Sequence, residues 1–335
     1  MLSFTLRKLA ALVGTMLGIA ALTFLITNVA PGDPARLVAG PNATEDMVET
    51  IRVQNGLDKP VTEQFVIYMS DLVRGDLGTS IVTTRPVLDE LLRYAPATIE
   101  LVLVAMALGI LVGVPMGMLS AVYRNSWFDH ATRIFSISGV ALPAFWFGIL
   151  LQLLFAVQMG WLPVSGRLPL VALPPEPITH LLLVDSLLRG QFDTFWTALK
   201  HIILPAVVLS FPCLASILRV NRAEMIEVLS SDHVVAARAH GLSSGRIVAL
   251  YALKNAMLPT LAMIGLRFGW MLGSTVLVET VFDWPGIGLY AVSSALASDF
   301  KPVIGVTLLI GFFFIVANTI VDLAYAWIDP RLRNA

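Results

Sequence analysis

Apolar stretches of about 20 residues, the length that an α-helix needs to cross the hydrocarbon core of a bilayer, recur along the chain. They lie at residues 9–29, 98–122, 134–159, 202–218, 258–278 and 303–328. Backbone polar groups inside a bilayer need partners within the protein, so each stretch is predicted to be a helix. The pattern therefore predicts an all-α, polytopic membrane protein of about six transmembrane helices.

The composition agrees with a bilayer as the solvent. Hydrophobic residues make up 57% of the 335 residues and charged residues 13%, whereas soluble domains carry roughly 25% charged residues. The net charge of -1 gives no basic field that would attract nucleic acid. Cys213 is the single cysteine, so it cannot form an internal disulfide. It lies in an apolar run and is expected to pack among neighbouring side chains.

The first stretch is either a retained anchor or a cleaved signal peptide. Arg7 and Lys8 precede it, as basic residues precede signal peptides. Its apolar run is longer than that of a typical signal, and the sequence Pro-Gly-Asp-Pro at 31–34 stands where a small-residue cleavage site would be expected. We therefore expect residues 1–29 to form a retained N-terminal transmembrane helix.

Basic residues in short loops predict the orientation, because such residues are enriched on the cytoplasmic side of a membrane. If the N-terminus is inside, the inner segments hold Arg7, Lys8, Arg124, Arg133, Arg219, Arg222, Arg238, Arg246, Lys254, Arg331 and Arg333. The outer segment 30–97 also carries basic residues, but a loop of that length has little weight in this rule. Both termini are therefore predicted to face the cytoplasm.

The predicted organisation has three parts. Residues 1–29 form the first helix, residues 30–97 a large outer loop region, and residues 98–335 a five-helix core that includes the inner loop 219–257. Apolar residues at helical spacing predict a further helix over 61–73 in the outer loop region. A second outer loop, at about 160–200, is rich in proline.

Small residues at four-residue spacing predict close helix packing, because they let two helix backbones approach each other. They are Gly109, Gly113 and Gly117 in one stretch, and Gly265, Gly269 and Gly273 in another. Pro143 is a candidate kink within the stretch 134–159.

Motifs of several enzyme classes are missing from the sequence. No lysine is followed by Ser or Thr, so these 335 residues contain no Walker A motif for nucleotide phosphates. Residues 241–245 fit the string Gly-x-Ser-x-Gly, but a nucleophile elbow needs a strand before it, and a helical pattern precedes it here. An intramembrane protease would need paired catalytic groups within its helices, where only Glu100, near the start of the second stretch, Arg267 and Asp322 are charged. We expect no catalytic residues, metal or cofactor.

The inner loop carries the most informative pattern. Val235, Ala236 and Ala239 give a small apolar face to a short helix that Gly241 ends, and Arg238 and His240 give it a polar face. A second helical pattern follows, with apolar residues in register at Ile247, Leu250, Leu253 and Met257. Two short amphipathic helices outside the bilayer need something to pack against, so a partner protein is expected.

This segment resembles the signature cytoplasmic loop of importer permeases in the ATP-binding-cassette superfamily, in which Glu-Ala-Ala is followed after three residues by Gly and after nine more by Ile-x-Leu-Pro. Ala236, Ala237, Gly241 and Leu253 match that pattern. Val235 stands in place of the usual Glu, and the usual Pro is replaced by Lys254 and appears later in the chain. These departures leave a docking surface intact and put in doubt any polar contact made by the usual Glu.

The variant "ARAHGLS" with "LKNAMLP" is similar to the dipeptide/oligopeptide/nickel subfamily, and most similar to its B-type dipeptide permease subunits. Further stretches along nearly the whole chain support the resemblance: "FTLRKLAALV", "APGDPA", "GLDKP", "GDLGTS", "PVSGR", "HIILPAVVL", "WPGIG" and "DPRLR". Each stretch alone is weak evidence for the resemblance, which rests on their number and on their order along the chain.

The resemblance implies a type I importer permease in a bacterial inner membrane, with a large periplasmic loop after the first helix. It implies a second permease subunit, two cytoplasmic ATPase subunits and a periplasmic substrate-binding protein as partners, and dipeptides or short peptides as substrate. The residues that would couple to the ATPase are Ala236, Ala237, Arg238, Ala239, His240 and Gly241. A passive channel, a secondary transporter, or an importer of nickel, glutathione or haem are the alternatives.

Three residues are candidates for lining the pathway. Arg267 lies inside the fifth stretch, where it would attract a peptide carboxylate, pair with Asp322 or extend to the interface. Phe145 and Trp146 follow Pro143 and either line the pathway or pack against lipid and neighbouring helices.

Overall fold

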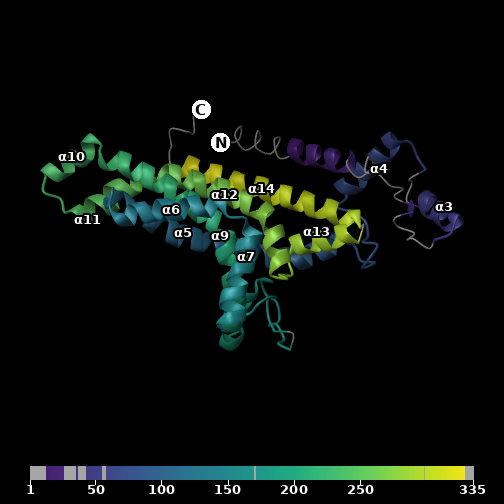
Figure 1. Cartoon of the computed structure of the whole chain (residues 1–335). Helices are drawn as coiled ribbons and strands as arrows, with labels where there is room; N and C mark the ends of the chain where they lie inside the picture. Colours follow the sequence, from purple (N-terminus) through teal and green to yellow (C-terminus); the bar gives the residue numbers. More distant parts are fainter. Residues whose placement is uncertain are drawn as a thin grey trace. The chain divides into compact units, whose positions relative to one another are not determined.

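A computed structural model describes residues 13–25, 35–36, 43–54, 58–169, 171–297 and 299–328. This part of the chain is helical and contains no β-strand, only an isolated bridge between Thr79 and Pro86. The helical content confirms the all-α part of the prediction (Figure 1). The chain forms two compact units: Met1–Pro96 with Pro285–Phe313, and Ala97–Trp284 with Phe314–Ala335.

The first unit contains a small apolar core formed by the start of α5 (Val87–Val122), α13 (Ile287–Leu296) and the start of α14 (Phe300–Ile328). Its other elements are the helix Val13–Leu25, α3 (Glu45–Gln54) and α4 (Val61–Val73). Val87, Leu91, Ile287 and Val306 lie in the buried core. The helix predicted at 61–73 is confirmed as α4.

The second unit holds most of the long helices. Its elements are the rest of α5, α6 (Trp127–Ala141), α7 (Ala144–Leu151), the π-helix η1 (Gln152–Gln158), α8 (Leu182–Leu188), α9 (Phe192–Leu229), α10 (Asp232–Ala239), α11 (Ser244–Arg246), the π-helix η2 (Ile247–Ala252) and α12 (Leu253–Val281). Helix α9 is central, since it packs against α6, α7, α8 and α12. Pro205 and Pro212 lie within this helix, and packing against neighbouring helices allows a spanning helix to tolerate proline.

The small-residue stripe of α5 lies against α9, which confirms the close helix packing predicted for this stripe. A Cβ atom added at Gly113 would lie 3.1 Å from Ile217 Cγ2, and one added at Gly117 would lie 2.8 Å from the Leu218 carbonyl oxygen. Glycine therefore sets the distance between the two helices. Cys213 is buried in the same contact, with its Sγ 3.8 Å from Met106 Sδ, which confirms a packing role for the thiol.

Four helices of the described part are long and apolar enough to cross a membrane: Val87–Val122, Phe192–Leu229, Ser244–Val281 and Phe300–Ile320. They contain the predicted stretches 98–122, 202–218 and 258–278 and most of 303–328, and extend beyond several of them. Helix α9 begins ten residues before position 202 because residues 192–200, assigned to a loop from the sequence, continue its helical pattern. Only Val13–Leu25 of the first stretch is described, and the rest of 9–29 lies outside the described residues.

The third predicted helix is broken in two. Trp127–Ala141 and Ala144–Gln158 are bent by 110° at the break, so they form either one broken span or a re-entrant loop (Figure 1). Leu142, which precedes Pro143, has φ −80° and ψ 127°, because the proline ring disfavours helical backbone in the residue before it. The stretch predicted as one helix over 134–159 is therefore two helices, and the candidate kink at Pro143 is confirmed as a sharp turn.

Candidate functional site

The inner loop forms a helical hairpin, hereafter the α10 hairpin, which consists of residues 232–252. Only Ser230 and Ser231 separate α9 from α10. Helix α10 ends at Ala239, and Gly241 has φ +77°, a conformation that favours glycine over other residues. The turn at 240–243 then leads into α11 and η2, as the sequence predicted for two short helices around Gly241.

Three buried side chains hold the hairpin together. Val234, Ala237 and Ile247 form a cluster, with the partly buried Val228, Leu229 and Leu242 packed around it. Ala237 is 6% exposed, so it belongs to the interior of the hairpin. A helix of eight residues is not stable by itself in water. Helix α10 therefore depends on packing against this cluster.

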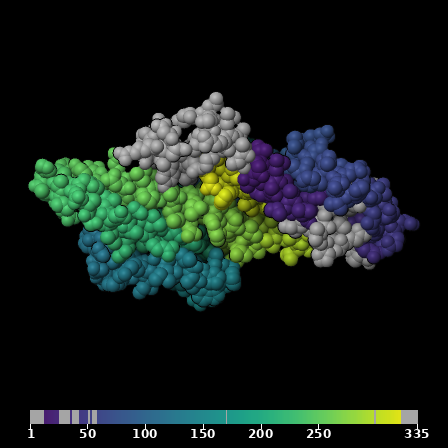
Figure 2. All heavy atoms as spheres, turned by 90° about the horizontal axis from the view of Figure 1, so that it is seen from above, coloured from purple at the N-terminus to yellow at the C-terminus, as the bar shows by residue number. Residues whose placement is uncertain are grey.

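The opposite side of α10 is open. Val235 is 56% exposed, and the exposed residues beside it are Ala236, Arg238, Ala239 and His240. In the space-filling view the green atoms of α10 form one end of the second unit, and no other segment covers them on the face that is seen (Figure 2). The apolar residues expected together at Val235, Ala236 and Ala239 are thus exposed together. Gly241 is exposed as well, in the turn that follows.

Residues 241–245 form the turn between helices that the sequence favoured. Helix α10 precedes Gly241, and α11 begins at Ser244. A nucleophile elbow needs a strand before the serine, and α10 occupies that place.

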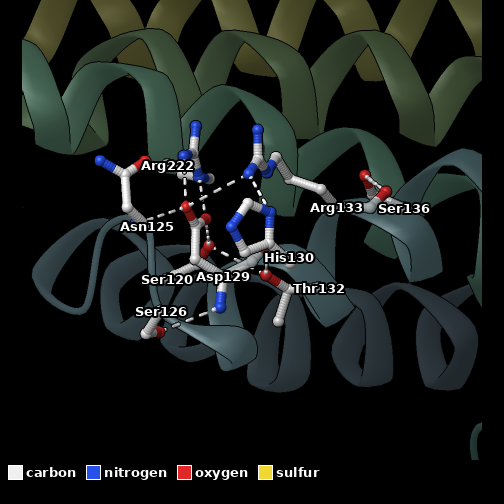
Figure 3. A network of polar contacts seen from close by, with 9 residues as sticks. All are labelled: Ser120, Asn125, Ser126, Asp129, His130, Thr132, Arg133, Ser136 and Arg222. Atoms are coloured by element: carbon white, nitrogen blue, oxygen red, sulfur yellow. Dashed lines mark hydrogen bonds and ion pairs between the residues drawn. The ribbon is translucent and has the colours of Figure 1, made fainter.

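A buried polar network ties α6 to α9 and α5 (Figure 3). Asp129 of α6 is 0% exposed, and its carboxylate accepts two hydrogen bonds from Arg222 of α9, from Nε at 2.6 Å and from Nη2 at 2.9 Å. Ser120 of α5 donates a third at 2.7 Å. Arg133 lies 3.9 Å away and is 44% exposed, so it is a weaker partner. The paired N–H groups of a guanidinium fix both the distance and the orientation of the two side chains.

Local sequence explains how Asp129 reaches this position. Ser126 caps the N-terminus of α6 and accepts a hydrogen bond from the Asp129 backbone N–H at 3.3 Å. The Asp129 carboxylate in turn accepts from the Asn125 backbone N–H at 3.0 Å. Asn125 has φ +63°, a left-handed conformation that Asn adopts more readily than most residues. Cap and turn therefore fix the carboxylate opposite Arg222.

A second buried ion pair lies nearer the other end of α5. Glu100 is 4% exposed and accepts hydrogen bonds from Arg167 Nε at 3.1 Å and from the Leu183 backbone N–H at 2.6 Å. Arg167 also lies over the ring of Trp284, 5.9 Å from its centroid. Glu100 thus anchors the proline-rich segment and the start of α8 to α5.

Asp185 of α8 fixes the same segment. Its Oδ1 accepts hydrogen bonds from the Thr179 backbone N–H at 2.8 Å and from the Thr179 hydroxyl at 2.7 Å. Burial alone would raise the pKa of this carboxyl, but the hydrogen bonds from Thr179 and from the Ile178 and His180 backbones hold the pKa below its usual value. The carboxylate is therefore the form that the loop binds.

The three candidate pathway residues differ in their surroundings. Arg267 lies in α12, and its buried Nε has no hydrogen-bond partner among the described residues. The pair proposed with Asp322 lies outside the described side chains. Phe145 and Trp146 are 48% and 46% exposed in the single chain, whereas the next residue, Phe147, stacks on Phe211 with ring centroids 4.9 Å apart.

Sequence reasoning missed the two buried ion pairs. Asp129 and Glu100 lie near the ends of apolar stretches, where charges normally face water. One signal was available: Ser126 and Asp129 have the spacing of a helix N-cap, which places an acidic side chain at a defined point of the first turn. The partner residues could not be found in this way because they lie far away in the sequence.

Long apolar helices that pack into a bundle, with one small helical hairpin whose outer face is exposed, are the arrangement of a polytopic membrane protein. The chain belongs to the family described as the binding-protein-dependent transport system inner membrane component, whose model matches residues 113–334. The model of the N-terminal region of such components matches residues 1–102. The resemblance drawn from the inner loop and the scattered motifs is confirmed, including its dipeptide-type subfamily.

Relatives match the chain over nearly its full length. It is 47% identical to the probable D,D-dipeptide transport system permease protein DdpB of Escherichia coli, over 96% of this chain and 94% of the relative. It is 38% identical to the dipeptide transport system permease protein DppB of Alkalihalophilus pseudofirmus, over 99% and 100%. A structure of the MetNI methionine ABC transporter in an inward-facing conformation has the same fold, with a TM-score of 0.53 and 15% identity over 71% of this chain and 96% of that one.

Proposed function

We propose that this permease forms half of the translocation pathway of an ATP-binding-cassette importer for dipeptides or short peptides. Its relatives carry names of dipeptide transport permeases and span the same length. In this role the chain performs no chemistry itself, and ATP is hydrolysed on partner subunits. The proposal rests above all on the open face of α10, which has the residue pattern of a coupling helix.

The proposed topology has about six crossings with both termini in the cytoplasm. In it, the α10 hairpin is cytoplasmic, and residues 30–97 and the segment that Glu100 anchors are periplasmic. The basic residues around the hairpin, such as Arg219, Arg238 and Arg246, support this orientation. The helix Val13–Leu25 would be the described part of the first crossing, and the bent pair α6–α7 would supply the third.

Docking of an ATPase subunit would use the exposed residues of α10. Small side chains at Ala236 and Ala239 allow a close approach, Val235 supplies apolar area, and Arg238 and His240 supply charge and hydrogen bonds. Ala237 would act from inside the hairpin by holding this face in place. When the two ATPases close on ATP, they would bring the two coupling helices together and turn the pathway outward.

The remaining partners would complete the pathway. A second permease subunit would form the other half, and a periplasmic binding protein would deliver the substrate. Dipeptides are zwitterions, so the buried guanidinium of Arg267 would attract the substrate carboxylate. Phe145 and Trp146 would line the pathway on the outer side of the Pro143 break.

Uptake and co-purification test the proposal together. A strain that lacks this chain should lose ATP-dependent uptake of a labelled dipeptide, and the wild-type gene should restore it. An affinity-tagged chain should bring down an ATPase subunit, and the V235D variant should bring down much less. Uptake that proceeds in vesicles holding only this chain, without ATP, would indicate a channel or secondary transporter instead.

A further inference from the structure

The last turns of α9 connect the α10 hairpin to the rest of the second unit. Val228 and Leu229 pack against the hairpin cluster of Val234, Ala237 and Ile247. The same two residues also pack against a second cluster, formed by Ala121, Met225, Ala252 and Ala256. Because packed side chains have few alternative arrangements, a displacement of α10 must move the end of α9.

The end of α9 is in turn held by the Asp129–Arg222 ion pair. Arg222 precedes Leu229 by seven residues, which is about 10 Å along the helix at 1.5 Å per residue. From there its guanidinium reaches Asp129 of α6, whose carboxylate also accepts from Ser120 of α5. Three helices therefore meet at one buried carboxylate (Figure 3). The helix that carries Arg222, α9, leads directly into α10.

The physical properties of this pair suit positioning better than stability. A buried ion pair adds little over apolar side chains of the same shape, because removing two charges from water offsets much of their attraction. Its geometry, however, is strict, since both N–H groups of Arg222 must face both oxygens of Asp129. Such a contact makes two helices move together even when the surrounding apolar contacts would allow them to slide.

We infer that Asp129 and Arg222 are positioning residues. When an ATPase moves α10, they make the start of α6 move with it, in a fixed orientation to α9 and the end of α5. This inference rests on the proposed function, because it assumes that α10 is the docking helix. Without the pair, ATPase closure would displace α10 and the end of α9, and α5 would still follow through the packing of Ala121 on Met225. The orientation of α6 relative to α9 and α5 would no longer be fixed. ATP would then be hydrolysed without a matching opening of the pathway.

The test is the number of substrate molecules transported per ATP hydrolysed. It uses the complete transporter in proteoliposomes, with both permeases, the ATPases, the binding protein and a labelled dipeptide. The D129N variant keeps the shape of the side chain and removes its charge, and R222K keeps the charge but loses the paired contact. We expect the ratio to fall at least about threefold in both variants while ATP hydrolysis continues. Substitutions between two coupled sites typically change the coupling between them by factors of this order.

The matched control is E100Q, which removes a pair of the same kind. Glu100 and Arg167 are 4% and 20% exposed, compared with 0% and 19% for Asp129 and Arg222. Glu100 lies 20 residues before Ser120, about 30 Å along α5 at 1.5 Å per residue. The transport-to-ATP ratio should therefore stay within about twofold of wild type in E100Q, because this pair does not touch the end of α9.

Two results would overturn the inference. One is an unchanged ratio in D129N and R222K, with transport and hydrolysis falling only in proportion to the amount of assembled complex. The other is an equal loss of ratio in E100Q. If D129N fails to assemble, R222K decides the question. A wild-type complex with no ATP-dependent uptake would refute the proposed function itself, and is thus distinguishable from either result.

Discussion

Val235 and Ala237 lie two residues apart on α10 and face opposite ways. Val235 is 56% exposed, while Ala237 is 6% exposed and contacts the hairpin cluster. A helix turns by about 100° per residue, so two positions are enough to separate a partner-facing side chain from a core-facing one. The pair therefore separates docking from folding within a single helix.

The V235D and A237E variants should fail in different ways. V235D adds charge to an exposed side chain, so we expect a change in stability within about 0.5 kcal/mol but a loss of ATPase binding of about tenfold or more. A237E buries a charge without a partner and should unfold the hairpin at a cost of at least about 2 kcal/mol. Thermal unfolding of the purified chain and ATPase pull-down measure the two effects. Normal ATPase binding by V235D would show that the ATPase docks on a surface other than the exposed face of α10.

Glycine packing between α5 and α9 gives a second prediction. In G117A the new Cβ would lie 2.8 Å from the Leu218 carbonyl oxygen, so the helices must separate, at a cost of about 1–3 kcal/mol. The control is G273A on α12, where nothing lies within 4 Å and we expect a change within about 0.5 kcal/mol. The midpoint of thermal unfolding in detergent should fall for G117A alone. Equal midpoints would contradict the close packing of α5 on α9.

Removal of the Glu100 carboxylate should release the proline-rich segment. E100Q leaves Arg167, which is 20% exposed, without its charged partner. The expected cost is up to about 3 kcal/mol, less than for a fully buried pair because water reaches the guanidinium. The released segment should be cut faster by proteinase K between α7 and α8. If the cleavage rate of E100Q matches that of wild type, the segment is held by its apolar contacts.

Acid should weaken the attachment of the same segment through Asp185. The folded-state pKa of this carboxyl is lowered, so its contribution to stability is fully present above the unfolded value of about 3.9. It is lost as the pH falls through the lower, folded-state pKa. The difference in unfolding temperature between wild type and D185A should be constant from about pH 7 to pH 5 and shrink below about pH 4. A difference that does not change with pH would mean that Asp185 acts without its charge.

The Arg267 guanidinium should determine how well substrate carboxylates are recognised. We expect R267Q to reduce uptake of a dipeptide with a free C-terminal carboxylate by about tenfold, the loss of one hydrogen bond to a charged group. Uptake of the corresponding dipeptide amide should change much less. Competition assays on whole cells measure both, with the amount of assembled complex as the control. Equal losses for the two substrates would assign Arg267 a structural role.

Features that depend on nearby residues could be predicted from the sequence. The period of apolar positions indicated α4, and Gly241 indicated the end of α10, because each requires only local backbone geometry. The stripe of Gly109, Gly113 and Gly117 indicated close helix packing, because a helix face without bulky side chains lets a neighbouring backbone approach it.

Features that depend on which helices are neighbours could not be predicted. Asp129 and Arg222 are 93 positions apart, and no local pattern pairs one with the other. The burial of Ala237 depends on Ile247, which belongs to the π-helix η2. Pro143 indicated a break, but the angle there also depends on packing, including that of Phe147 on Phe211.

The 110° turn at Leu142 and Pro143 bears on how this chain should be mapped in a membrane. If α6 runs along the bilayer normal, α7 lies closer to the membrane plane than to that normal and runs partly backward. Hydropathy averages count apolar residues without regard to their direction, so they register one passage where the backbone changes course. Reporter fusions meant to establish sidedness therefore need insertion points on both flanks of Pro143.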